Sequence, residues 1–285
     1  MKGNKELFLI ATVGRTGSTY FTQWLNGFVD IRCHEELLNT SNTRDSIYHY
    51  WNSNLLRKVV RKVFGDSKTE FKNNRFTRYL IKNFLLSLLH NPSHSAPWDS
   101  YEGRRSFFRQ TSKDRNAHLV GFKLIPGDVK YFGNVLKTEN LVKTSKVILL
   151  VRQNLLASHV SFLKAQQTGF YHTSQDSTAT DKKQKIKVPL DSLLKSLAHL
   201  KNEEVSLMEF FKDHERLVVS YEEFFFDHER VKPLILDFLK PQSSEQEKQP
   251  NLKKTSAIRL SDNIDNYEEV CNALADTPYK TYLND

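Results

Sequence analysis

The stretch that decides the fold is Leu7–Phe28, which reads LFLIATVGRTGSTYFTQWLNGF. Its beginning, Leu7–Val13, is an apolar run typical of a strand that is buried on both faces of a sheet. Apolar residues then recur at the spacing of one helical face, at Phe21, Trp24, Leu25 and Phe28. The stretch therefore predicts a strand, a polar turn and an amphipathic helix in direct succession.

The turn between strand and helix is made of Gly14, Arg15, Thr16, Gly17, Ser18 and Thr19. A glycine-containing turn before a helix binds phosphate, because the first N–H groups of the helix lack partners and its dipole is positive there. The glycines let the backbone wrap an anion, and the hydroxyls and the guanidinium add donors. The turn has no lysine and its glycines are three positions apart, so it departs from the nucleoside triphosphate loop G-x-x-x-x-G-K-[ST]. We expect a tetrahedral anion here; a plain strand–turn–helix is the alternative.

Composition places the chain among globular proteins that favour anionic ligands. Its 285 residues suffice for one large α/β domain or two small ones, and the formal net charge is +9. No zinc-finger spacing or RNA-binding aromatic motif points to nucleic acid, and the two cysteines form no metal-site pattern. No apolar run approaches the roughly 18 residues of a membrane span, and the first residues do not read as a signal peptide. We expect a soluble cytoplasmic protein.

A second candidate anion site follows the buried run Val147–Val151, which Arg152 continues directly. An arginine at the carboxyl end of a parallel strand lies on the edge where open α/β sheets bind ligands. Asn154 is the predicted N-cap of a helix over Leu155–Gln166. Two serines on that helix are further candidates: Ser158 and Ser161.

Acidic residues return about 20 positions after the turn, at Glu35 and Glu36, directly after His34. A second short strand would bring them back beside the turn, where a carboxylate could act as a general base on a hydroxyl. The alternative is a solvated, acidic helix start. A further strand is predicted over Leu119–Ile125, which carries Lys123 and is closed by a Pro-Gly pair.

The remaining segments complete a predicted single α/β domain over residues 1–285, with a mostly parallel, P-loop-like sheet flanked by helices. Residues 43–115 are interpreted as basic amphipathic helices inserted between core strands, since nine Lys/Arg oppose two acids between Arg57 and Lys82. Such helices are typical of a solvated face; a lid over an anionic substrate or a membrane-surface contact are the functional alternatives. Further predictions are a mobile loop over 167–189, a helix over 190–212 and a strand over 217–220. Residues 221–226 and 231–239 are expected to lead into a helix ended by Lys240-Pro241, followed by a surface loop over 242–251 and a last helix over about 262–275.

These residues together resemble the sulfotransferases that use 3′-phosphoadenosine 5′-phosphosulfate, most closely bacterial carbohydrate sulfotransferases of the nodulation-factor type. Their 5′-phosphosulfate loop reads approximately R-[ST]-G-[ST]-[ST], matched by RTGST at residues 15–19. Their 3′-phosphate motif is a strand, an arginine and a helix with a serine, matched by VILLVRQNLLASHVSF. The resemblance extends to Gly121-Phe122-Lys123, Tyr221-Glu222 and the C-terminal DNIDNYEEVCNAL. Many members place the serine eight residues after the arginine, whereas here Ser161 is nine after Arg152 and Ser158 six; Gly14 stands where a proline is frequent.

The resemblance implies roles for particular residues. The donor's 5′-phosphosulfate would lie against Arg15, Thr16, Gly17, Ser18 and Thr19, and its 3′-phosphate against Arg152 and Ser161, with Ser158 second and Lys253 or Lys254 assisting. An acceptor hydroxyl would attack sulfur in line, with charge stabilised by Arg15 and Lys123. The glutamate of the family's G-E-L-[LF] context aligns with Glu36, ahead of Glu35 and His34. The product would be 3′-phosphoadenosine 5′-phosphate, and no metal is required.

The resemblance also implies a glycan or glycolipid hydroxyl as the acceptor. We expect the 43–115 and 167–189 segments, which lie outside the resemblance, to choose it. Three other readings stay open. A P-loop-type small-molecule kinase would need a phosphate-binding lysine and a magnesium-holding aspartate that are not in register. A non-catalytic anion- or polysaccharide-binding protein would suit the charge, and a catalytically inactive relative would suit the shifted serine.

Overall fold

The computed structural model describes residues 6–34, 117–130, 145–168, 185–246, 248, 250 and 259–283. Several sequence-based expectations lie outside these ranges, namely the basic helical insertion 43–115, residues 169–184 of the predicted loop, Glu35, Glu36, Lys253 and Lys254. The described residues hold the strands and helices that form the core.

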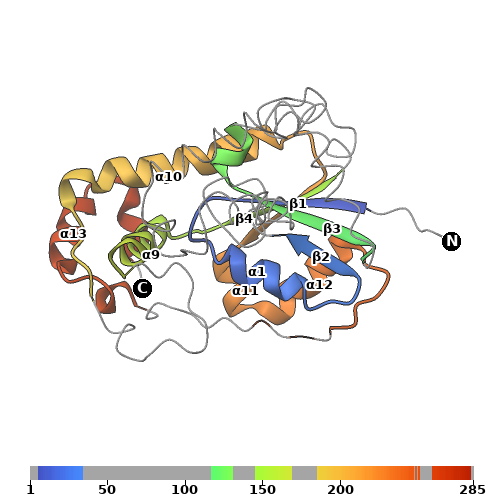
Figure 1. The fold of residues 1–285 in the computed structure, drawn as a ribbon. Helices are drawn as coiled ribbons and strands as arrows, with labels where there is room; N and C mark the ends of the chain where they lie inside the picture. The colour runs from blue at the N-terminus through green and yellow to red at the C-terminus, as the bar shows by residue number, and fades with distance from the viewer. Residues whose placement is uncertain are drawn as a thin grey trace, which may run out of the picture.

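Five strands of the described chain form one parallel sheet in the order β2-β3-β1-β4-β5 (Figure 1). The strands are β1 (Glu6–Thr12), β2 (Ile31–His34), β3 (Leu119–Leu124), β4 (Lys146–Val151) and β5 (Arg216–Ser220). β1 lies at the centre and pairs with β3 and β4, with Ile10 opposite Lys123 and Thr12 opposite Leu150. The mostly parallel α/β fold predicted from the sequence is confirmed.

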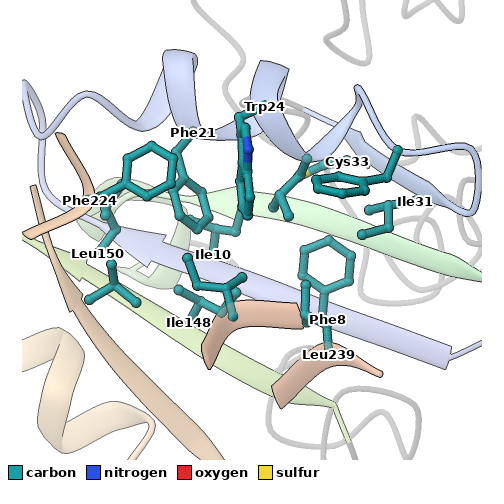
Figure 2. Packing of buried hydrophobic residues seen from close by; sticks show 14 of the residues in the cluster. Phe8, Ile10, Phe21, Trp24, Ile31, Cys33, Ile148, Leu150, Phe224 and Leu239 are labelled. Atoms are coloured by element: carbon teal, nitrogen blue, oxygen red, sulfur yellow. The ribbon is translucent and has the colours of Figure 1, made fainter. Parts of the chain in front are cut away.

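Helices cover both faces of the sheet (Figure 1). One face carries α1 (Ser18–Leu25), α11 (Tyr221–Phe226) and α12 (His228–Leu239), and the other carries α10 (Leu190–Phe210). Under α1, Phe21 and Trp24 point into a cluster with Phe224 of α11 and with Ile10 and Ile148 of the sheet (Figure 2). Burying a large apolar side chain stabilises the fold by about 1.5–3 kcal/mol, so this cluster fixes α1 firmly behind the turn that precedes it.

A third apolar cluster lies beyond the end of β4. It joins α9 (Leu155–Thr168), the first half of α10, the 3₁₀ helix η2 (Leu260–Asp262) and α13 (Tyr267–Leu274). Ile186 and Val188 are buried in it, and the Asn266 side chain bonds both the N–H and the carbonyl of Val188. The described end of the predicted 167–189 loop is therefore packed into the core.

Element boundaries differ from the expectations where tertiary contacts intervene. Phe28 is buried but lies past the end of α1, in a bridge with Gln246. Backbone hydrogen bonds from Val29 to Glu245 and from Lys248 to Gly27 flank this bridge, so part of the predicted 242–251 loop is paired with the segment after α1. The predicted last helix begins later, at Tyr267, because the backbone of Asn263 and Asp265 hydrogen-bonds Ile186.

The strand order places a topological switch point between β1 and β4. After β1 the chain crosses towards β2 on one side of the sheet, whereas after β4 it moves to β5 on the other side. Ligands in open α/β sheets bind at the carboxyl ends of strands at such a point. The two segments that lie there are the turn after β1 and the residues that follow Val151.

Candidate functional site

Two threonines hold the turn after β1 from the inside. The Thr12 hydroxyl donates to the Leu150 carbonyl of β4 at 2.8 Å and also shares a short hydrogen bond with the Thr16 hydroxyl. Thr16 is fully buried. Because the Thr16 hydroxyl is buried, any contact between Thr16 and a ligand has to come from its backbone. The prediction that the hydroxyls of the turn face an anion is thereby limited to the other two, Ser18 and Thr19.

Gly17 forms the corner between the turn and α1. Its φ is 72°, in the left-handed region, and a Cβ built there would lie 2.8 Å from the Tyr221 ring and 2.9 Å from the Phe225 ring. Gly17 is the N-cap of α1 and supplies no capping side chain, so the first N–H groups of the helix point at the turn without a side-chain acceptor. Ser18 and Thr19 belong to the first turn of α1 itself.

Arg152 crosses from the end of β4 to this turn. Its Nη1 donates to the Arg15 carbonyl at 2.9 Å, and its guanidinium carbon lies 4.5 Å from the centre of the Tyr221 ring. Arg15 itself has a left-handed backbone, with φ 67°, so Arg152 bonds the turn at its most strained non-glycine residue. The two arginines predicted to bind anions are therefore in direct contact through the backbone of one of them.

Burial leaves the Arg152 guanidinium short of partners. Its Nε is buried and has no hydrogen-bond partner among the described residues, and the nearest carboxylate oxygen, Glu222 Oε1, is 4.0 Å away. Burial lowers the pKa of Arg152, and Tyr221 and Glu222 oppose that shift. A buried cation with an unused donor is costly unless an anion meets it.

The helix after Arg152 carries the two candidate serines, Ser158 and Ser161. Asn154 is the N-cap, since its Oδ1 accepts from the Ala157 N–H at 2.9 Å; this confirms the prediction. Ser161 accepts a hydrogen bond from Arg15 Nε at 3.0 Å, whereas the Ser158 hydroxyl is buried and finds no partner in the described part of the chain. Ser161 therefore lies beside the turn, in contact with Arg15.

The end of β2 lies two strands away from β1 on the same edge of the sheet. A short strand does return the chain to this edge, as predicted, and His34 ends it with its ring stacked on Phe122 at 5.6 Å. Lys123 is buried on β3, next to the end of that strand. Glu36 follows His34 by two positions and lies outside the described residues.

Tyr221 and Glu222 also lie at the candidate site, and the sequence patterns indicated no role for either of them. Tyr221 packs against both Arg152 and Gly17, and the Glu222 carboxylate accepts from the backbone N–H groups of Gln153 at 3.0 Å and Asn154 at 3.3 Å. In the sequence, the two residues are visible only as an aromatic-acidic pair directly after a predicted strand. They reach Arg152 because β5 pairs with β4, and no local sequence pattern predicts that pairing.

The arrangement fits an extended ligand with two anionic groups. One group would meet the N-terminus of α1 and the turn, and the other would meet the unused Nε of Arg152 and the serines of α9. Within the described ranges, no cluster of three His, Cys, Asp or Glu residues could hold a metal ion. No helix of the described residues is long and apolar enough to cross a membrane.

Fold and site together define an α/β protein with a pair of candidate anion positions at a sheet switch point. The family model of the Stf0 sulphotransferases matches residues 123–270, more than half of the chain. The chain therefore belongs to the Stf0 sulphotransferase family, whose class of reaction is sulfuryl transfer.

Solved structures of sulfotransferases are similar in arrangement. The sulfotransferase domain from the curacin biosynthetic pathway is 14% identical with a TM-score of 0.45, covering 92% of this chain and 83% of that one. A sulfotransferase from Alicyclobacillus acidocaldarius is 10% identical with a TM-score of 0.46, covering 99% and 94%. The sulfotransferase domain of the Synechococcus PCC 7002 olefin synthase is 16% identical with a TM-score of 0.42, covering 90% and 82%. No curated protein matches the sequence.

Proposed function

We propose that this sulfotransferase moves a sulfuryl group from 3′-phosphoadenosine 5′-phosphosulfate to a hydroxyl of a glycan, glycolipid or similar acceptor. The observation that carries the proposal is the contact between Arg152 and the backbone of Arg15. It joins a helix N-terminus suited to one anionic group to a buried guanidinium suited to another. A donor with phosphate at both its 3′ and 5′ positions has that pair of groups.

The donor-binding residues divide between the two strand ends. The 5′-phosphosulfate is assigned to Arg15, Gly17 and the N-terminus of α1 with Ser18 and Thr19, and to Thr16 through its backbone alone. The 3′-phosphate is assigned to Arg152 and Ser161, with Ser158 as the alternative hydroxyl. Replacing each serine by alanine in turn and measuring affinity for the 3′,5′-bisphosphate decides between the two.

The transfer step needs a base and positive charge at the sulfuryl group. The bound donor supplies an activated sulfuryl group; the acceptor oxygen attacks sulfur in line while the bond from sulfur to the phosphate oxygen breaks. Glu36 takes the hydroxyl proton, and Arg15 and Lys123 stabilise the charge on the sulfuryl oxygens. The position of β2 supports Glu36, because that strand ends at His34 on the same edge as the turn. Glu35 and His34 are the alternatives.

The choice of acceptor is assigned to parts of the chain outside the core. The domain is proposed to be one unit over 1–285, in which the 43–115 insertion and the 167–189 segment select the acceptor. The resemblance to nodulation-factor-type enzymes supports a carbohydrate or lipid-linked hydroxyl. The basic composition of the insertion also suits contact with an anionic membrane surface.

A thermal-shift comparison tests the donor assignment directly. The protein is heated with 3′-phosphoadenosine 5′-phosphate, with ADP and with ATP–Mg²⁺, each at the same concentration. A ligand at 100 times its dissociation constant stabilises the fold by about 2.7 kcal/mol, which is readily seen. We expect selective stabilisation by the bisphosphate, followed by transfer from labelled donor to a glycan panel. Stabilisation by ATP–Mg²⁺ alone would favour a kinase instead, and no stabilisation would contradict the donor assignment.

A further inference from the structure

The two acids in the first turn of α11, Glu222 and Glu223, have different hydrogen-bond partners. Glu223 bonds residues close to it in sequence: its carboxylate accepts from the Ser220 N–H at 3.2 Å and hydroxyl at 2.8 Å, and from Arg230 Nη2 at 3.1 Å. Together with the bond from the Glu223 N–H back to Ser220, this is a capping box that stabilises the start of the helix. Glu222, the residue before it, reaches across to another strand end.

Glu222 is bonded to the backbone that directly follows Arg152. Its Oε2 accepts from the Gln153 N–H at 3.0 Å, and its Oε1 accepts from the Asn154 N–H at 3.3 Å. One carboxylate therefore accepts from two consecutive backbone N–H groups. Its Oε1 also lies 4.0 Å from Arg152 Nε. This fixes where β4 ends and α9 begins, and so the direction in which the arginine leaves the backbone.

Tyr221 completes the support of Arg152. Its ring lies under the guanidinium at 4.5 Å, which leaves Arg152 bounded by a ring on one side and a carboxylate on another. Arg152 Nη1 then reaches the Arg15 carbonyl, and Arg15 Nε reaches Ser161. A displacement of Arg152 would therefore also displace the turn after β1, where the other anionic group is proposed to bind.

A negative charge beside an anion site is unfavourable on charge grounds alone. Coulomb repulsion between Glu222 and a bound phosphate weakens binding. Another effect of the carboxylate has to outweigh this repulsion, and its hydrogen bonds to the backbone after Arg152 supply one. We infer that Glu222 is a positioning residue for the proposed sulfotransferase reaction: it holds Arg152 and residues 153–154 in the arrangement that recognises the 3′-phosphate. The inference rests on the proposed function, because it takes the 3′-phosphate as the ligand of Arg152.

The Glu222→Gln variant distinguishes a role of Glu222 through its charge from a role in positioning Arg152, because the two roles predict opposite changes in bisphosphate affinity. If Glu222 acted only through its charge, its removal would tighten anion binding. If it positions Arg152, we expect the dissociation constant of 3′-phosphoadenosine 5′-phosphate to rise about tenfold or more, the usual size for losing hydrogen bonds to a charged group. Affinity for adenosine 5′-monophosphate, which lacks the 3′-phosphate, should stay within about threefold of wild type on the same scale.

Two further variants separate position from charge. Glu222→Asp keeps the charge but shortens the side chain, so it cannot span both N–H groups, and we expect it to resemble Glu222→Gln. Glu223→Gln is the matched control: it removes the same charge from the same helical turn while a glutamine still completes the capping box. We expect its bisphosphate affinity to equal that of wild type.

Binding is measured by titration calorimetry well below each variant's melting temperature, with far-UV circular dichroism to show that the protein is folded. Bisphosphate binding as tight as wild type in Glu222→Gln, or wild-type binding in Glu222→Asp, would overturn the inference. Equal weakening towards both nucleotides would also overturn it, since that is the result of a merely structural role. If the wild-type protein does not prefer the bisphosphate to the monophosphate, the proposed function fails instead.

Discussion

The two sides of the switch point are built in different ways. We name each side after its proposed role: the transfer side consists of the turn 13–17, α1 and the end of β2, and the recognition side consists of Arg152, α9 and the first turn of α11. The transfer-side turn is shaped largely by neighbours in sequence, with Gly17 at its corner and the Thr12–Thr16 hydrogen bond inside it, and two long-range hydrogen bonds from Thr12 and Arg152 join it to the end of β4. The recognition side is shaped by distant residues, since Tyr221 and Glu222 hold Arg152 from another strand end.

The two sides should therefore respond differently to substitution. A locally built turn keeps its shape when one ligand-facing side chain is removed, so substitutions there alter chemistry. A side chain held by tertiary contacts loses its position when any one partner is removed, so substitutions there alter binding. We therefore expect transfer-side variants to lower turnover and recognition-side variants to weaken nucleotide affinity.

The largest expected effect is on the transfer side. Glu36→Gln removes the proposed general base, and turnover should fall by about 10²–10⁴-fold. Its affinity for 3′-phosphoadenosine 5′-phosphate should stay at the wild-type value, since the base binds the acceptor's proton and not the nucleotide. Steady-state transfer assays and calorimetry on one preparation measure both. Unchanged turnover would reject Glu36 and direct attention to Glu35.

The next effect sharpens the recognition side. Arg152→Ala should weaken bisphosphate binding by about ten- to a hundredfold, because it removes charge-assisted hydrogen bonds worth about 1.5–3 kcal/mol. Far-UV circular dichroism should show little change in fold. Since Arg152 also bonds the Arg15 carbonyl, turnover at saturating donor should fall as well. A variant with wild-type bisphosphate affinity would show that the buried guanidinium does not meet the nucleotide.

A pair of glycine substitutions tests how the transfer-side turn is built. Gly17→Ala should lower the free energy of unfolding by about 1–2 kcal/mol through its left-handed backbone alone, and the displaced Tyr221 and Phe225 rings should add to this. Gly14→Ala is the control, because nothing lies within 4 Å of its Cβ position, and we expect a change within about 0.5 kcal/mol. Urea unfolding compares the two. Equal losses would mean that the strain at Gly17 does not decide the turn.

The smallest effect concerns acid sensitivity of the recognition side. Burial lowers the pKa of His159 on α9 below its usual 6.5. The unfolded chain then binds more protons than the folded one, so stability should fall as the pH drops from 6.5 towards the lowered pKa and be unaffected above neutrality. His159→Gln should therefore flatten the dependence of the melting temperature on pH between pH 7.5 and 5.5. An unchanged pH profile in His159→Gln would contradict this assignment.

Local patterns predicted the strands, most helices and Asn154 as a cap, because buried runs, helical spacing and capping side chains act within a few residues. They also predicted the turn and the strand-end arginine as candidate anion sites. They could not predict that the Thr16 hydroxyl faces inward. Its partner is the Thr12 hydroxyl, which is itself held by the Leu150 carbonyl at the end of β4. Nor could they show Glu222 beside Arg152, 70 positions earlier in the chain, or the late start of α13, which follows from the pairing with Ile186.

The parallel sheet also has a consequence for how the protein folds. The hydrogen bond from Arg152 to Arg15 spans 137 positions in sequence, and each strand pairs with a neighbour across a long connection. Closing such connections costs chain entropy before the contacts are gained, which slows folding of parallel topologies. The proposed nucleotide site can exist only once β1 and β4 have met. A refolding chain should thus regain helical signal before it regains bisphosphate binding, which makes that ligand a reporter of completed folding.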